Sequence, residues 1–201
     1  MITKLIVLGM MKFSLFLVFL CFNFSLLFSQ EKYEREHRIN KTDFPAKASD
    51  LIQEKIVDSK KIKFYKEIDS LKITFKAKFK EDRLWYSIDF NKDGDLDNIK
   101  VQIKSVDIPN DSFETITSYL EDSFKSYKIK NIQQKYAANN EVDVTFKNAF
   151  QNLMLPSLQY ELLIAGKMNT HKEQFQILFD AEGVFKSSRK SLPPNYDHVL
   201  Y

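Results

Sequence analysis

Apolar and polar residues alternate strictly along two stretches of the first half of the chain. From Leu71 to Lys80, and again from Leu84 to Phe90, every second residue is apolar. This alternation is typical of a strand with one buried and one exposed face. Asp93-Gly94 then favours a tight turn, and alternate apolar residues from Ile99 to Ile103 predict the return strand.

A helix is predicted ahead of these strands. After Phe44-Pro45, apolar residues recur at helical spacing from Ala48 to Ile56, and proline is tolerated in a first helical turn. A strand-like run from Lys61 to Ile68 comes between this helix and the alternating stretches. The first half therefore reads as one helix followed by about four antiparallel strands.

The same order recurs in the second half. Ile108-Pro109 leads a helical stretch up to Phe124, which Asp111 or Ser112 can cap. Strand-like runs then follow at 127–136, 160–165 and 175–179, with a turn at 180–183 and a return at 184–185. The pattern predicts an α+β fold, a tandem repeat of two helix-plus-four-stranded antiparallel sheet units, each with its helix across one face.

These patterns divide the chain into segments. The first repeat is expected over 44–107 and the second over 108–190, with an insertion at 139–156 whose apolar spacing predicts a short helix. Residues 30–43 are expected to form an N-terminal lead in which the charge run 34–38 is solvated, and residues 191–201 a C-terminal strap.

The N-terminal segment has the pattern of a secretory signal peptide. Sixteen largely apolar residues, 13–28, follow Lys12 and precede a polar run. We place cleavage after Ser29, so that residues 1–29 are removed and the mature chain is periplasmic or secreted. An uncleaved anchor is the alternative, although the stretch falls short of the roughly 20 residues that span a bilayer. A lipoprotein would use Cys21, but bulky residues precede it.

Composition excludes several classes of function. Cys21 is the only cysteine, so a cleaved chain can form neither a disulfide nor a cysteine metal site. Residues 1–29 hold two lysines and no acid, which leaves 28 basic against 27 acidic residues and no reason to expect nucleic acid binding. Only four glycines are present, which disfavours a phosphate-cradling loop. No cofactor is expected.

The strand and turn sequences resemble a known group of proteins. The proline-led helix, the runs KIKFYKE, FKAKFK and YSIDFNKDG, and a second copy that ends in FQILFDAEG are similar to PepSY-like periplasmic proteins of the β-lactamase-inhibitor-protein-like fold. The resemblance covers roughly residues 44–190. It implies a tandem α-β4 repeat with a concave sheet face, and some relatives of that fold bind or inhibit other proteins. It carries no catalytic residue onto this chain.

One turn has the spacing of a calcium loop. Oxygen-bearing side chains and a glycine fall at positions 1, 3, 5, 6, 7 and 9 of that pattern, namely Asp89, Asn91, Asp93, Gly94, Asp95 and Asp97. Position 12, where calcium needs a bidentate carboxylate, is Lys100, and the flanks read as strands rather than helices. An acidic hairpin turn is therefore the preferred interpretation, and no metal site is expected.

Catalytic chemistry is not indicated. His37, His171 and His198 are isolated, with no ligand spacing around them, and no nucleophile motif is present. We therefore expect no enzyme, although a calcium-dependent enzyme that uses the acidic turn and His198 is an alternative.

The outward positions of the strands form the candidate binding surface. If the strands pair as predicted, Trp85 shares one open sheet face with Lys72, Lys76, Lys78 and Lys100. A tryptophan among cations is a plausible anchor for a partner. The simpler interpretation is that these lysines solubilise the sheet and that Trp85 packs at a junction.

The sequence thus predicts an exported, non-enzymatic binding or inhibitor-like module with a protein or peptide partner on the open sheet face. It predicts contact with a membrane only through an uncleaved signal segment. The alternatives are a calcium-binding envelope protein and a carrier that holds small apolar molecules between helix and sheet.

Overall fold

The computed structural model describes residues 35–56, 61–69, 72–138, 141–168 and 171–191, all of which belong to one compact unit. The predicted signal peptide and His198 lie outside these residues, as does all but the first residue of the predicted C-terminal strap. Among the described residues, no helix has the length and apolar character that crossing a membrane requires.

Nine strands in the described residues form one antiparallel sheet, in which each strand pairs with the next along the chain. The strands are β1 (Arg35–Ile39), β2 (Lys63–Asp69), β3 (Lys72–Glu81), β4 (Leu84–Phe90), β5 (Leu96–Ile103), β6 (Ser126–Ala137), β7 (Gln159–Lys167), β8 (Lys172–Phe179) and β9 (Phe185–Ser191). Because β5 pairs with β6, the sheet runs without a break from the first half of the chain into the second. The α+β class is confirmed.

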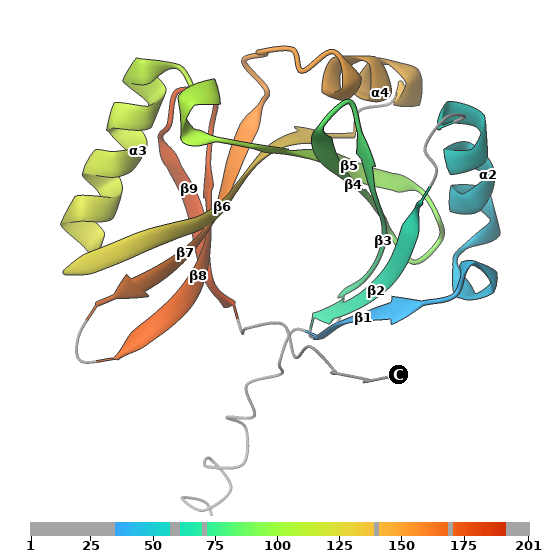
Figure 1. Ribbon diagram of the computed structural model, residues 1–201, viewed down its shortest axis with the longest axis horizontal. Helices are drawn as coiled ribbons and strands as arrows, with labels where there is room; N and C mark the ends of the chain where they lie inside the picture. The colour runs from blue at the N-terminus through green and yellow to red at the C-terminus, as the bar shows by residue number, and fades with distance from the viewer. Residues whose placement is uncertain (1–34, 57–60, 70–71, 139–140, 169–170, 192–201) are drawn as a thin grey trace, which may run out of the picture. The chain divides into compact units, whose positions relative to one another are not determined.

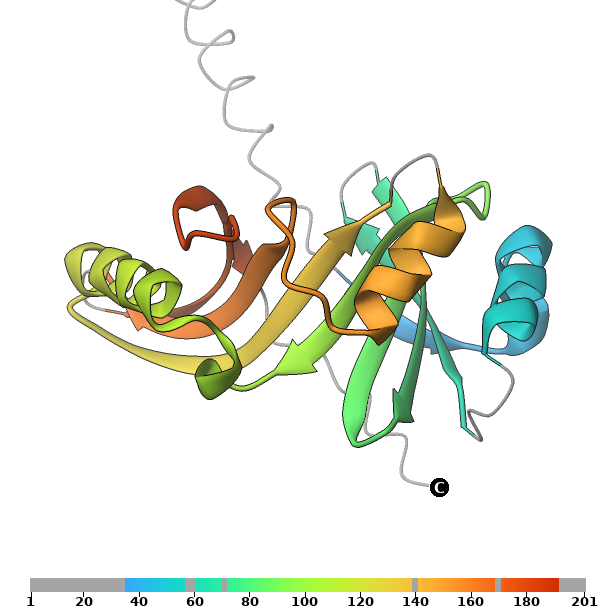
Figure 2. The same cartoon turned by 90° about the horizontal axis from the view of Figure 1, so that it is seen from above.

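Three helices of the described residues, α2 (Ala46–Lys55), α3 (Asn110–Ser123) and α4 (Val142–Phe150), lie on the same side of the sheet. The sheet curves away from them, so that its uncovered side is concave (Figure 1). Seen from above, α4 lies between α3 and α2 and crosses the middle of the sheet (Figure 2). The helix predicted in the insertion is therefore present as α4.

The core lies between the helices and the sheet. Alternate residues of the strands point toward the helices, and Ile88, Ile99 and Leu162 have no exposed surface. Aromatic side chains join the two layers: Phe150 of α4 stacks on Tyr86 with ring centroids 4.9 Å apart. Burial of this apolar surface is the main stabilising term of such a fold.

Residues 35–38 of the predicted N-terminal charge run belong to the edge strand β1. His37 and Arg38 are exposed, whereas Glu36 faces Glu67 of β2 and is partly buried. A strand with only one apolar residue, Ile39, gives no alternation that sequence reasoning can detect. The sheet therefore begins before the first predicted helix.

Candidate functional site

The concave side of the sheet, which no described helix covers, is the candidate site, and we call it the open face (Figure 1). It carries the strand residues that alternate with the core residues. A cavity of about 310 Å³ lies on it and is lined from β2 through β9 by Glu67, Asp69, Lys72, Thr74, Asp89, Asp97, Asn98, Lys100, Lys135, Glu161, Gln176, Leu178, Ser187, Ser188 and Arg189. Fourteen of these fifteen side chains are polar or charged, and Leu178 is the exception, so the lining suits a polar ligand.

Lys76 is the centre of one ion-pair cluster. Its ammonium group pairs with Glu67 and lies 3.1 Å from Glu36, which also pairs with Lys78. Burial opposes the charge of Lys76, but Asp89, Glu67 and Glu36 raise its pKa. Burial likewise opposes the charge of Glu36, yet Lys76 and Lys78 lower its pKa. In both groups the neighbouring opposite charges outweigh the effect of burial.

Lys100 is the centre of a second cluster. Its Nζ lies 2.9 Å from Glu161 and 3.5 Å from Asp89, and Asp89 also accepts a 2.7 Å hydrogen bond from Ser87. Asp89 and Lys100 are 3% and 8% exposed. Although burial opposes each charge, Lys100 lowers the pKa of Asp89 and of Glu161, and the two carboxylates raise the pKa of Lys100.

Ion pairs also link the two ends of the curved sheet. Arg189 of β9 contacts Asp69 of β2 at 2.7 Å across 120 residues of sequence, and it donates to Gln176 at 2.7 Å. Lys72 pairs with Asp97 at 2.8 Å. Every charged side chain that lines the cavity, except that of Lys135, is thus paired with another described side chain before any ligand binds.

The predicted binding residues lie on the open face but differ in exposure. Lys76 and Lys100 are largely buried in ion pairs, whereas Lys72 has 63% of its side chain exposed. Trp85 is 46% exposed and faces Lys80 across the β3–β4 hairpin. Lys78 lies over the ring of Tyr65, 4.7 Å from its centroid.

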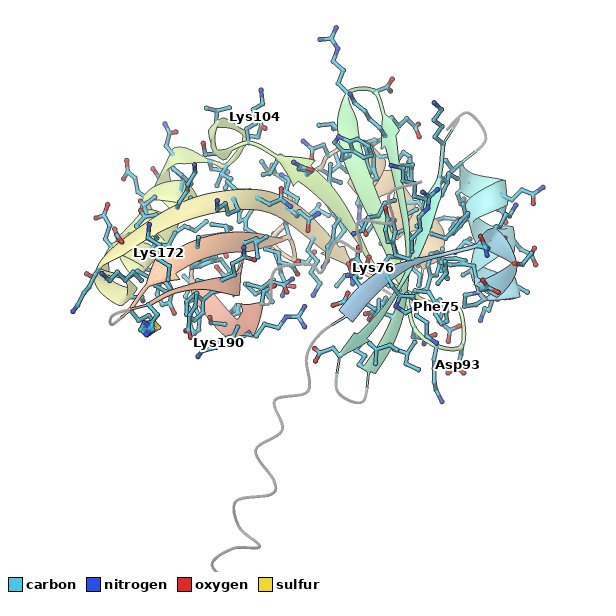
Figure 3. The ribbon with its side chains drawn as sticks, turned by 60° about the horizontal axis from the view of Figure 1, so that its bottom comes forward. Phe75, Lys76, Asp93, Lys104, Lys172 and Lys190 are labelled. Atoms are coloured by element: carbon cyan, nitrogen blue, oxygen red, sulfur yellow. The ribbon has the colours of Figure 1, made fainter. Side chains whose placement is uncertain are left out.

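The five candidate calcium ligands do not converge on one point. Asp89 points onto the open face toward Lys100, whereas Asp95 pairs with Lys47 and Asp97 with Lys72. Asn91 Oδ1 accepts hydrogen bonds from the backbone of its own turn at 2.9 Å. Figure 3 shows Asp93 on this turn, apart from Lys76. No three His, Cys, Asp or Glu residues within the described ranges are grouped as a metal ion requires.

Sequence reasoning named four lysines of this face and missed several of the charged residues around them. Glu36, Glu67, Glu161, Lys135 and Arg189 were not among the predicted site residues. Glu161 and Lys135 lie between buried residues of their strands, so alternation could have placed them on the open face. Glu67 and the residues of the edge strands β1 and β9 carry no such signal. Which acid meets which lysine depends on strand register and on the curvature of the sheet.

No family model matches the chain, and no curated protein matches it. Solved structures share its fold. A DUF2874 family protein from Bacteroides ovatus is 9% identical, with a TM-score of 0.51 over 73% of this chain and 87% of its own. A DUF2874 family protein from Bacteroides uniformis is 11% identical, with a TM-score of 0.50 over 73% and 88%. A BLIP-like protein from Bacteroides fragilis is 11% identical, with a TM-score of 0.47 over 77% and 92%. At these identities the first two similarities show a shared fold and nothing further.

Proposed function

We propose that the protein is a non-enzymatic binding module that holds a polypeptide partner on its open face. The observation that carries this proposal is the concave, uncovered sheet face on which most charged side chains are already paired with one another. A preorganised surface binds with less loss of side-chain entropy than a mobile one. The balance of both charge signs suits a polypeptide surface rather than the uniformly negative backbone of a nucleic acid.

Within this proposal the residues of the open face divide into two roles. Lys76 and Lys100 hold the buried ion pairs and keep the face in shape. Trp85, Lys72 and Lys78 have the exposed surface needed to contact a partner. An exposed tryptophan next to cations is the type of side chain that dominates binding energy in many interfaces.

Affinity capture from an envelope extract of the source organism tests the proposal. The protein, purified from the compartment to which the cell delivers it, serves as bait. Trp85→Ala and Lys72→Glu are tested in the same way. Lys147→Glu on α4 is the matched control, since Lys147 is exposed on the helix side of the sheet. We expect a partner that both open-face variants lose and the control retains. A partner held equally by all four proteins would refute the assignment of the open face.

Export is part of the same proposal. The apolar run at 13–28 and the polar run after Ser29 are its support. Sequencing of the N-terminus of the mature protein should give Gln30. A chain that retains residues 1–29 in the membrane fraction would instead favour an anchored protein.

We also propose that the open face is built from two copies of one α-β4 unit. Two turns support this. Asn91 and Asp180 accept bonds from the amides of Gly94 and Gly183, each at 3.1 Å, and both glycines have a positive φ, 82° and 83°. Each turn packs against the first turns of the helix that leads its half.

The glycines give a test of this equivalence. A Cβ on Gly183 would lie 2.2 Å from the backbone oxygen of Ser112, and one on Gly94 would lie 3.2 Å from Pro45 Cβ. Both glycines need a left-handed backbone, so Gly183→Ala and Gly94→Ala should each lower the melting temperature. The decrease should be larger for Gly183→Ala, because its Cβ would lie closer to its neighbour. An unchanged melting temperature in either variant would contradict equivalent roles.

A further inference from the structure

Lys135 differs from the other cations that line the open-face cavity. Lys72, Lys100 and Arg189 each pair with a carboxylate, whereas Lys135 forms no ion pair with any described residue. Its direct cross-strand neighbour is Lys100. Like charges opposite one another destabilise a sheet, so this arrangement has a cost for folding.

Lys135 is partly buried and lies beside another lysine. Burial, and then the charge of Lys100, lower the pKa of Lys135. The carboxylates of Glu161, Asp97 and Asp89 raise it to a lesser extent, and each of these already pairs with another lysine. A bound anion would supply the missing charge.

Asn98 offers a complementary group in the same cavity. It is 5% exposed, and its Oδ1 receives no hydrogen bond from the part of the chain that the structure describes. Asn98 faces Ala137 across β5 and β6, so it is the diagonal neighbour of Lys135 on the open face. Diagonal neighbours are about 7–8 Å apart, a span that one small ligand can bridge. A buried acceptor without a donor is a costly feature for which a ligand N–H would compensate.

We propose that this end of the cavity binds a carboxylate that has an amide N–H beside it, with the carboxylate on Lys135 and the N–H donated to Asn98 Oδ1. This chemistry is found at the C-terminus of a polypeptide and in a free N-acyl amino acid. The inference deepens the proposed function, because it names the group of the partner that the open face recognises.

Calorimetry and lysine-resolved NMR of the full-length chain test the inference. The probes are N-acetylglycine, the peptide Ala-Ala-Ala, and N-acetylglycine amide, which lacks the carboxylate. The variants are Lys135→Gln and Lys135→Met, with Lys128→Gln as control, because Lys128 is exposed on the same strand outside the cavity. Melting curves of every variant establish that it is folded.

We expect the two acids to bind saturably and to shift the ε signals of Lys135, and the amide probe not to bind. Both Lys135 variants should bind at least about tenfold more weakly, as loss of a charge-assisted hydrogen bond implies, while Lys128→Gln binds normally. Tighter binding of the peptide would identify a chain terminus as the ligand, and tighter binding of N-acetylglycine a free small acid.

Absence of binding by both acids, or equal binding by the Lys135 variants, would overturn the inference. The proposed function has a separate readout in partner capture. If Lys135→Gln still captures a partner that Trp85→Ala loses, and no acid binds, the open face remains the binding surface and only the carboxylate assignment fails.

Discussion

The two faces of the sheet are built from the same strands, yet they are held together by different interactions. On the helix-covered face, Ile88, Ile99 and Leu162 pack in a continuous apolar layer. On the open face, the alternate residues Asp89, Lys100 and Glu161 form ion pairs. Each of these charged residues is the direct chain neighbour of one of those apolar residues.

This difference shows where a polar function can be placed. An apolar layer tolerates many substitutions of similar volume, because dispersion and burial are not directional. A buried ion pair depends on particular partners, and hydrophobic side chains often stabilise a fold as well or better. Ion pairs between β4, β5 and β7 are therefore a costly way to stabilise a sheet, which is consistent with a binding role for the open face.

Lys100→Ala should have the largest effect on stability. It removes the cation shared by Asp89 and Glu161 and leaves two buried carboxylates without it, so we expect a loss of about 3–5 kcal/mol in the free energy of unfolding. Urea denaturation monitored by circular dichroism measures this loss.

Lys72→Ala is the matched control, because its pair with Asp97 on the same face is exposed. The expected loss is below about 1 kcal/mol. Equal losses for the two variants would mean that burial does not distinguish the inner ion pairs from the outer ones.

Leu162→Ala and Leu163→Ala compare the two faces with the same substitution at adjacent positions. Leu162 is fully buried against the helices, whereas Leu163 is partly buried and lies on the opposite face. We expect a loss of about 3 kcal/mol for Leu162→Ala and about 1 kcal/mol for Leu163→Ala. Thermal or urea unfolding measures both, and a reversed order would show that the side assigned to the core is wrong.

Acid should weaken the open face gradually, which is the smallest of these effects. The pKa values of Glu36, Asp89 and Glu161 are lowered in the folded protein, despite burial, by the lysines beside them. The stability they contribute is present above the ordinary carboxyl pKa, about 4, and is lost as the pH falls through the lowered values.

The free energy of unfolding measured from pH 6 downward checks this dependence. In Lys100→Ala the pKa values of Asp89 and Glu161 should rise, so acid should cost that variant less than it costs the wild type. Parallel acid profiles for the two proteins would contradict the ion-pair assignment.

Much of the fold follows from local pattern. Alternation from Leu71 to Lys80 and from Leu84 to Phe90 predicts strands that the structure has at 72–81 and 84–90, and helical spacing in the insertion predicts α4. The same alternation predicts that Trp85 and its neighbour Tyr86 lie on opposite faces of the sheet, with Tyr86 in the core. These features could be predicted because they depend only on residues close together in sequence.

The rest depends on contacts between distant segments. Glu36 reaches Lys76 from an edge strand that has too few apolar residues to be recognised, and Arg189 meets Asp69 only because the sheet curves. The calcium-like spacing of Asp89 to Asp97 does not bring the side chains together, since three of these acids pair with different lysines. Register and curvature are decided by the whole sheet.

Lysine labelling followed by mass spectrometry, with and without the captured partner, tests the binding role of the open face most directly. We predict that the partner protects Lys72 and Lys78 on the open face, while Lys47 and Lys147 on the helix side react as in the free protein. Protection confined to Lys47 and Lys147, with Lys72 and Lys78 as reactive as before, would contradict the account.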